Sequence, residues 1–116
     1  ALGCAQLENL DRYVADKRET AARYAEFFKG KEDITFFTEP ADCKSNYWLN
    51  AVVLKDKAAQ LDFLEYTNDH GVMTRPVWEL MNRLPMFEHC ETDGLENTEW
   101  LADRVVNIPS SVRLDK

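Results

Sequence analysis

The sequence lacks the features that mark several large classes of protein. It has 14 basic residues against 21 acidic ones and a formal net charge of -7, so it has no basic surface of the kind that neutralises the phosphates of a nucleic acid. No apolar run approaches the roughly 20 residues that a membrane-spanning helix needs. We therefore expect a soluble protein that binds neither nucleic acid nor membrane.

Cysteine and glycine are also scarce. The three cysteines, Cys4, Cys43 and Cys90, are odd in number and far apart, a pattern that matches neither a disulfide framework nor a zinc cluster. The simplest interpretation is a protein of the reducing cytoplasm. The four glycines form no phosphate-cradling Gly-x-Gly-x-x-Gly loop, so the sequence does not predict a self-contained nucleotide site.

The length and the histidines exclude further kinds of enzyme. A chain of 116 residues, 45% of them apolar, is long enough for one domain with a real core and too short for a large multi-domain enzyme. His70 follows a predicted helix, whose dipole favours an imidazolium there. His89 and Cys90 are adjacent, so their side chains diverge in a helix or a strand, which excludes a nucleophile with its base.

The first 28 residues have the pattern of one long helix. Apolar side chains recur at steps of three, four and seven residues: Leu7, Leu10, Val14, Ala21, Tyr24 and Phe28. A helix over residues 2–28 would be roughly 40 Å long, whereas a domain of this size has a radius of gyration of only about 13 Å. Because the chain also begins without a methionine, we expect an upstream domain and an exposed apolar stripe through Leu2, Leu7, Leu10 and Val14. An ordinary long helix packed across its own sheet is the alternative.

The remainder of the chain alternates short strands with helices. We predict strands at residues 34–38, 47–54, 72–75 and 104–108, and helices at 57–69, 77–83 and from residue 98. Strand 47–54 is almost continuously apolar, as expected for a central strand covered on both faces. Asp56 caps the helix that follows it, and Gly71 ends that helix. This order predicts an α+β fold with a small mixed sheet flanked by helices.

The segment from Gly71 to Trp78 is the most suggestive of a binding site. Arg75 ends a predicted short strand and precedes a proline turn, and its guanidinium could bind a carboxylate or phosphate bidentately while the indole of Trp78 stacks on a sugar or base. The alternative is an exposed or carboxylate-paired arginine and a tryptophan buried in the core. Residue chemistry alone favours that alternative, because arginine and tryptophan most often serve those ends.

Short motifs in a fixed order extend over almost the entire chain. They are Ala1–Glu8, Lys17-Arg18 with Tyr24, Asn46–Leu49, Gly71–Pro76, Leu84–Phe87 and Asn107–Ser111. Together they resemble the small C-terminal domain of the DegT/StrS sugar aminotransferases, which are pyridoxal-phosphate enzymes of the aspartate aminotransferase-like fold. The nearest branch places an amino group on nucleotide-linked 4-keto sugars, in pathways to surface polysaccharides and nonulosonic acids. The resemblance implies an interdomain helix at residues 1–29 and a small α+β domain at residues 30–116.

The resemblance also implies that the cofactor is held elsewhere. Family members bind pyridoxal phosphate in a large N-terminal domain, through a lysine Schiff base and an aspartate, and that domain would precede Ala1. Lys44, Lys55 and Lys57 lack the surrounding motif of the Schiff-base lysine. We therefore expect no cofactor and no activity in this fragment alone. The complete enzyme would transfer an amino group from glutamate to the keto sugar, as a cytoplasmic homodimer.

Six residues are carried over from the resemblance as a candidate substrate site, and no catalytic or metal-binding residue is predicted. Arg75 matches the family's arginine after the threonine, and Trp78 stands where an aromatic residue is usual. This chain has Leu80-Met81-Asn82 where the family more often has Pro-Leu-His, so Asn82 suggests a different sugar preference. The other three candidates are Asn46, Tyr47 and Trp48. A stand-alone α+β binding or regulatory module, whose acidic surface contacts partners, is the alternative from another functional class.

Overall fold

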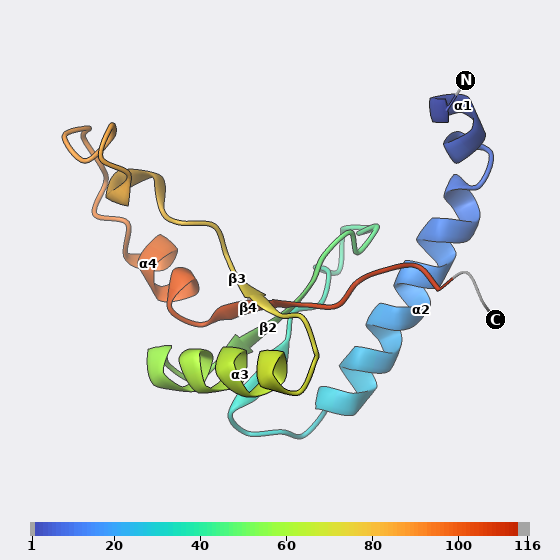
Figure 1. The fold of residues 1–116 in the computed structure, drawn as a ribbon, viewed down its shortest axis with the longest axis horizontal. Helices are drawn as coiled ribbons and strands as arrows, with labels where there is room; N and C mark the ends of the chain where they lie inside the picture. Colours follow the sequence, from blue (N-terminus) through green and yellow to red (C-terminus); the bar gives the residue numbers. More distant parts are fainter. Residues whose placement is uncertain (1, 114–116) are drawn as a thin grey trace.

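The N-terminal region of the protein is helical but not one continuous helix. The computed structural model describes residues 2–113 and begins with α1 (Leu2–Leu7) and α2 (Leu10–Phe28) (Figure 1). The predicted single helix over residues 2–28 is therefore wrong at Glu8 and Asn9. The side-chain Nδ2 of Asn9 donates a hydrogen bond to the Ala5 carbonyl at 3.1 Å, and an asparagine that bonds locally to the backbone competes with helix continuation.

The described residues form a four-stranded sheet with strand order β1-β2-β4-β3. The strands are β1 (Ile34–Phe36), β2 (Asn50–Leu54), β3 (Arg75–Pro76) and β4 (Val105–Ile108). Between them lie α3 (Lys57–Asp69), the short 3-10 helix η1 (Met81–Arg83) and α4 (Glu96–Ala102). The α+β class and the small helix-flanked sheet predicted from the sequence are confirmed.

The sheet is antiparallel throughout, where a mixed sheet was predicted. Each neighbouring pair, β1 with β2, β2 with β4 and β4 with β3, is antiparallel. Strands β2 and β3, which α3 connects, therefore run in the same direction but are not neighbours. A strand-helix-strand unit predicts parallel strands, and here β4 inserts between the two. That insertion comes from a strand about 30 residues further along the chain, so the local pattern did not reveal it.

The core lies on one face of this sheet. Register places Phe36, Val52 and Val106 on that face, and all three are buried. Side chains of α2 and α3 pack against them, including Ala21, Tyr24, Ala59, Phe63 and Leu64. Burial alternates along β2, whose Ala51 and Val53 are only half-buried. The prediction that both faces of this strand are covered is therefore wrong, since both helices cover the same face.

Helix α3 begins and ends where the sequence predicted. The carboxylate of Asp56 accepts a hydrogen bond from the Ala59 amide at 2.8 Å, and Gly71 has a φ of 75°. Inside the helix, Gln60 is fully buried and its Nε2 donates to the carbonyls of Ala102 at 2.9 Å and Val105 at 2.8 Å. This amide therefore ties α3 to the end of α4 and to the first residue of β4.

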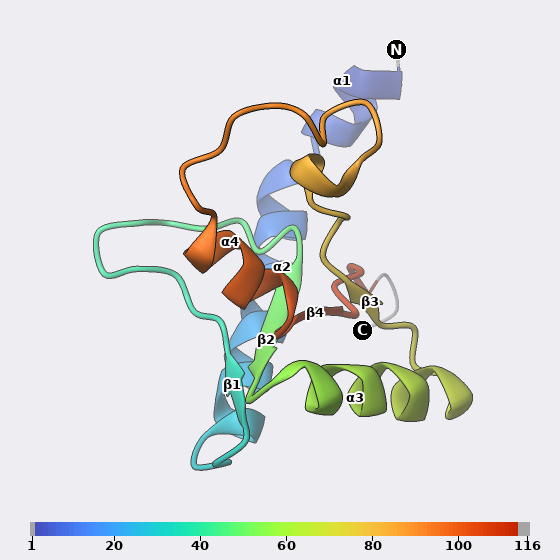
Figure 2. The same ribbon diagram turned by 90° about the vertical axis from the view of Figure 1, so that its left-hand side faces the viewer.

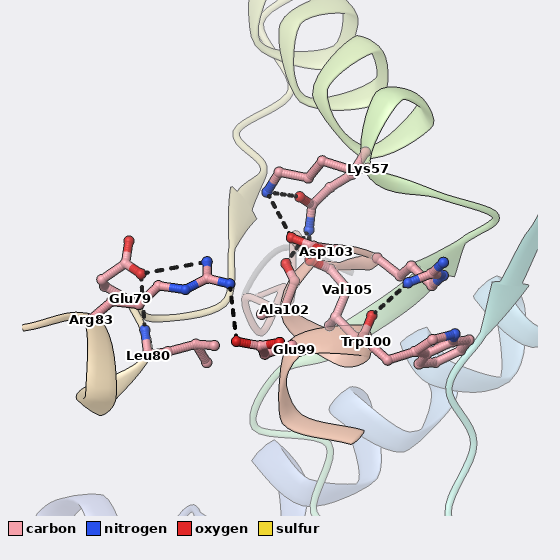
Figure 3. Close-up of polar contacts among 11 residues, drawn as sticks. Lys57, Glu79, Leu80, Arg83, Glu99, Trp100, Ala102, Asp103 and Val105 are labelled. Carbon is pink, nitrogen blue, oxygen red and sulfur yellow. Dashed lines mark hydrogen bonds and ion pairs between the residues drawn. The ribbon is translucent and has the colours of Figure 1, made fainter. Parts of the chain in front are cut away.

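Residues 77–104 form an arm that projects from the sheet, toward the upper left in Figure 1 and toward the top in Figure 2. The predicted helix over residues 77–83 is reduced to η1, and α4 begins two residues before the predicted Thr98. Arg83 joins the two ends of the arm, with its guanidinium 3.9 Å from Glu79 and 3.8 Å from Glu99 (Figure 3). The radius of gyration is 16.8 Å, above the roughly 13 Å of a compact domain, because this arm and the α1–α2 helices extend outward. In residues 2–113 no helix is both long and apolar enough to span a bilayer.

Candidate substrate-binding site

Two adjoining cavities form one groove at the β3 edge of the sheet. Their volumes are about 370 Å³ and about 460 Å³, within the usual range for small-molecule sites. Both are lined by Trp48, Leu49, Arg75 and Asn107. The first cavity adds Lys17, Met73 and residues 108–111, and the second adds Pro76 and Trp78. We call this combined space the groove.

Arg75 lines both cavities of the groove, and its guanidinium is free to bind a ligand. Strand β3 places it opposite Asn107 of β4, and Pro76 next to it lacks the amide hydrogen that would extend the sheet. Within residues 2–113, the Arg75 side chain is exposed and has no hydrogen bond or ion-pair partner. Its planar fork of donors is therefore available to a carboxylate or phosphate.

Two indoles line the groove beside Arg75. The side chains of Trp48 and Trp78 are 66% and 72% exposed, although tryptophan is usually well buried in a folded chain. The alternative in which Trp78 belongs to the core is therefore wrong. Exposed aromatic faces next to a free guanidinium form a surface on which a flat ring or a sugar can stack while a negative group is bound.

An ion pair between α2 and the loop before β2 holds the segment that carries Trp48. Arg18 binds Glu39 bidentately at 2.9 Å and 2.6 Å and also donates to the Ser45 carbonyl at 2.5 Å. The Ser45 amide donates to the same carboxylate at 2.5 Å. The hydrogen bond from Arg18, followed by that from the Ser45 amide, lowers the pKa of Glu39 to about 2, and the same contact raises the pKa of Arg18.

Asn46 and Tyr47 shape this loop rather than line the groove. The Oδ1 of Asn46 accepts a hydrogen bond from the Trp48 amide at 2.9 Å, which closes a tight turn. Tyr47 adopts a left-handed backbone with a φ of 47°, and its hydroxyl oxygen accepts a hydrogen bond from the Glu39 amide at 3.1 Å. The Tyr47 ring stacks on Phe36, with centroids 6.4 Å apart. Both residues therefore present Trp48 to the groove.

The structure places Asn82 apart from the other candidates. It is half-buried in the 77–104 arm and lines a different, mainly apolar cavity of about 440 Å³ with Phe87 and Leu95. Arg75, Trp78 and Trp48 do not line that cavity. The six candidates thus divide into three that line the groove, two that support its loop and one, Asn82, that lines the separate cavity in the arm.

Two groove residues were missing from the predicted site. Lys17 of α2 lines the first cavity, and its ammonium donates to the Ser110 carbonyl at 2.6 Å and lies 3.5 Å from the Trp48 carbonyl oxygen. Asn107 lines both cavities, and its Nδ2 is 3.4 Å from the Pro76 carbonyl oxygen. Both residues belong to motifs that carry the family resemblance, and these motifs were the only feature of the sequence that could have pointed to Lys17 and Asn107 as site residues.

The groove does not by itself match the needs of pyridoxal phosphate. Its described lining residues include two cations, Lys17 and Arg75, but no carboxylate that could face the pyridine nitrogen. The Lys17 ammonium is already directed at two backbone carbonyls, whereas a Schiff-base lysine needs a free amine. Nor do residues 2–113 contain a cluster of three or more His, Cys, Asp or Glu side chains that could hold a metal ion.

Comparison with known proteins identifies the family. A model of the DegT/DnrJ/EryC1/StrS aminotransferase family matches residues 1–116. The chain belongs to this family. EpsN of Bacillus subtilis (strain 168), a predicted pyridoxal phosphate-dependent aminotransferase, is 29% identical in a 113-residue alignment that covers 94% of this chain and 29% of EpsN. A GDP-perosamine synthase of Vibrio cholerae is 26% identical in a 113-residue alignment that covers 95% of this chain and 30% of the synthase.

The fold agrees with this assignment. The solved structure of Helicobacter pylori PseC, an aminotransferase involved in the biosynthesis of pseudoaminic acid, superposes with a TM-score of 0.87 at 19% identity, covering 98% of this chain and 32% of PseC. The resemblance found in the sequence motifs is confirmed at the level of family and fold. The chain spans about 30% of the length of the relatives that it matches.

Proposed function

We propose that this chain is the C-terminal small domain of a pyridoxal-phosphate-dependent aminotransferase that transfers an amino group from glutamate to a nucleotide-linked 4-keto sugar. Family membership supports the reaction class, and a relative named as a GDP-perosamine synthase supports a nucleotide sugar as the acceptor. In the proposed enzyme the cofactor domain lies outside this chain, which matches about 30% of each relative, and pyridoxal phosphate would supply the electron sink there.

The exposed apolar side chains of the N-terminal helices support this domain assignment. Leu2, Leu7 and Leu10 are 77%, 66% and 48% exposed, and such a stripe is typical of a surface that another part of the protein covers. In the proposed enzyme, residues 1–29 form the interdomain helix and residues 30–116 the small domain. The enzyme would be a homodimer in the cytoplasm. Exposed free cysteines, here Cys4, Cys43 and Cys90, are suited to that reducing compartment.

One observation carries the proposal for the site: Arg75, which has no partner among residues 2–113, lines one groove together with two exposed indoles. In this proposal Arg75 binds a negative group of the substrate, and Trp48 and Trp78 stack on its ring system. Asn46 and Tyr47 contribute by fixing the position of Trp48. Asn82 contacts the substrate only if the sugar extends toward the 77–104 arm, so we assign it no direct contact.

The experiment is a kinetic comparison of Arg75 variants in the full-length enzyme. Arg75→Ala should raise the KM for the nucleotide keto sugar roughly 10- to 100-fold, because a hydrogen bond to a charged group contributes about 1.5–3 kcal/mol. Arg75→Lys should recover only part of this loss, since an ammonium does not bind bidentately. Arg23→Ala is the matched control, because Arg23 lies on the exposed side of α2 and pairs with Glu19.

Two outcomes would contradict the proposal. Unchanged kinetics for Arg75→Ala would remove Arg75 from the substrate site. A full-length protein that releases no amino sugar from any nucleotide 4-keto sugar, with glutamate as donor, would refute the aminotransferase assignment. The 116-residue chain alone should give no product, whereas a stand-alone module would show its binding activity without further sequence.

A further inference from the structure

The groove is positively charged within an acidic protein. The chain carries a net charge of -7, yet the described residues that line the groove include Lys17 and Arg75 and no aspartate or glutamate. A cleft lined by charge of one sign concentrates ligands of the opposite sign. The groove therefore favours an anion where the protein surface as a whole repels one.

Lys17 is the second cation of this groove, and no carboxylate of the described residues forms an ion pair with it. The ammonium donates to the Ser110 carbonyl at 2.6 Å and lies 3.5 Å from the Trp48 carbonyl oxygen. An ammonium has three N–H donors, so one remains for a ligand. Within the described part of the chain no carboxylate lies within 4 Å of this ammonium. The lysine thus holds two loops together and still presents a positive charge to the cavity.

Two separate cations and two indoles limit the chemistry of the ligand. A single carboxylate is satisfied by one guanidinium in a bidentate contact, which would leave Lys17 unpaired. Glutamate has two carboxylates, but it has no ring to stack on Trp48 or Trp78. A nucleoside diphosphate has both features, because it joins a flat base to at least two negative charges on adjacent phosphates.

We propose that Lys17 and Arg75 together bind the diphosphate of a nucleoside diphosphate, whose ring system stacks on Trp48 and Trp78. This inference rests on the proposed function and deepens it, because it adds Lys17 to the substrate site and assigns the diphosphate to the cationic part of the groove. Trp48 connects the two parts, since its side chain lines both cavities and its carbonyl oxygen lies beside the Lys17 ammonium.

The test measures nucleotide binding to the full-length enzyme with its cofactor by isothermal titration calorimetry. GDP, UDP and dTDP are the probes, and the corresponding nucleosides without phosphate are the reference ligands. Lys17→Gln keeps a donor for the Ser110 carbonyl and removes the charge. This substitution should lower the affinity for the nucleoside diphosphate by roughly 10- to 100-fold, measured with whichever of the three probes the unaltered enzyme binds. Affinity for the matching nucleoside should change less than about twofold.

Three further measurements complete the experiment. Lys17→Arg should retain most of the nucleotide affinity, because the charge is kept. Lys29→Gln is the matched control: Lys29 follows the last residue of α2, is exposed, pairs with Glu26 and lies outside the groove. In the unaltered enzyme, added salt should lower the affinity for the nucleoside diphosphate and leave the affinity for the nucleoside unchanged. This measurement does not depend on the folding of any variant.

Several results would overturn the inference. One is that the unaltered enzyme and Lys17→Gln bind the same nucleoside diphosphate with equal affinity. Another is that the unaltered enzyme binds none of GDP, UDP and dTDP, and a third is that its binding does not depend on salt. A rise in the KM for glutamate with unchanged nucleotide affinity would assign Lys17 to the amino donor instead. Failure of this inference is distinguishable from failure of the proposed function, because nucleotide binding is measured without turnover and amine transfer is measured separately.

Discussion

Asn50 provides the sharpest test of how this small domain is stabilised. Its side chain is 1% exposed on the core face of β2, and neither its Nδ2 nor its Oδ1 has a hydrogen-bond partner among the described residues. Burying an amide without such bonds costs about 1–3 kcal/mol on the scale of protein mutations. Asn50→Val removes both unpaired atoms and introduces a β-branched side chain suited to a strand. We expect the free energy of unfolding to rise by about 1–2 kcal/mol, after some loss to imperfect packing.

Thr74→Val is the matched control because it makes a similar replacement at a second buried polar position. Thr74 is 5% exposed, but its hydroxyl lies 2.5 Å from that of Thr67 and accepts from Asn68 at 3.0 Å. Removing the Thr74 hydroxyl leaves its partners unpaired, so the free energy of unfolding of this variant should fall by about 1–2 kcal/mol.

Urea denaturation of the chain, followed by circular dichroism, measures both changes as shifts of the midpoint at constant slope. The Ser110 hydroxyl accepts from the Asn50 backbone amide at 2.7 Å, and this bond persists in Asn50→Val. A variant less stable than the original chain would show that the Asn50 amide makes favourable contacts in the core. That result would refute the reasoning from unpaired polar atoms.

Two further predictions concern the loop before β2 and helix α3. Because the pKa of Glu39 is lowered to about 2 by Arg18, this carboxylate stabilises the fold above its ordinary pKa, and the contribution is lost as the pH falls from about 4.5 to about 2. A pH titration of stability should therefore show an acid-dependent difference between the original chain and Glu39→Gln, and coincident curves would contradict the assignment. Asp56→Ala removes the cap bond to the Ala59 amide and should cost about 1 kcal/mol, measured by thermal unfolding, whereas Asp56→Asn should retain most of the stability.

Local signals in the sequence predicted α3 well and the sheet less well. Asp56 and Gly71 mark the ends of this helix through their own side chain and backbone freedom, so no distant contact was needed. The order of strands depends on β4 inserting between β2 and β3, which the pattern of either strand does not encode. The interruption of the N-terminal helix depends on one hydrogen bond from Asn9, a contact that apolar periodicity does not register.

The same distinction applies to the groove. Arg75 and Trp78 are close in sequence, so a single segment predicted both. Lys17 is 31 residues from Trp48 and 93 from Ser110 along the chain, and on an amphipathic helix it has the pattern of an ordinary solvated charge. Its role depends on which loops the fold brings to α2. Periodicity identifies the face of a helix but not the loops that contact it.

Helix α2 explains why these distant segments form one groove. Lys17 and Arg18 are consecutive, so their side chains leave the helix about 100° apart. Lys17 contacts the carbonyls of Trp48 and Ser110, while Arg18 contacts Glu39 and the Ser45 carbonyl. One turn of α2 therefore positions both walls of the groove and the loop that supports Trp48. In the proposed enzyme, where α2 is part of the interdomain helix, a shift of this helix against the sheet would change the walls and the Trp48 loop together. The placement of the proposed cofactor domain would then be coupled to the geometry of the groove.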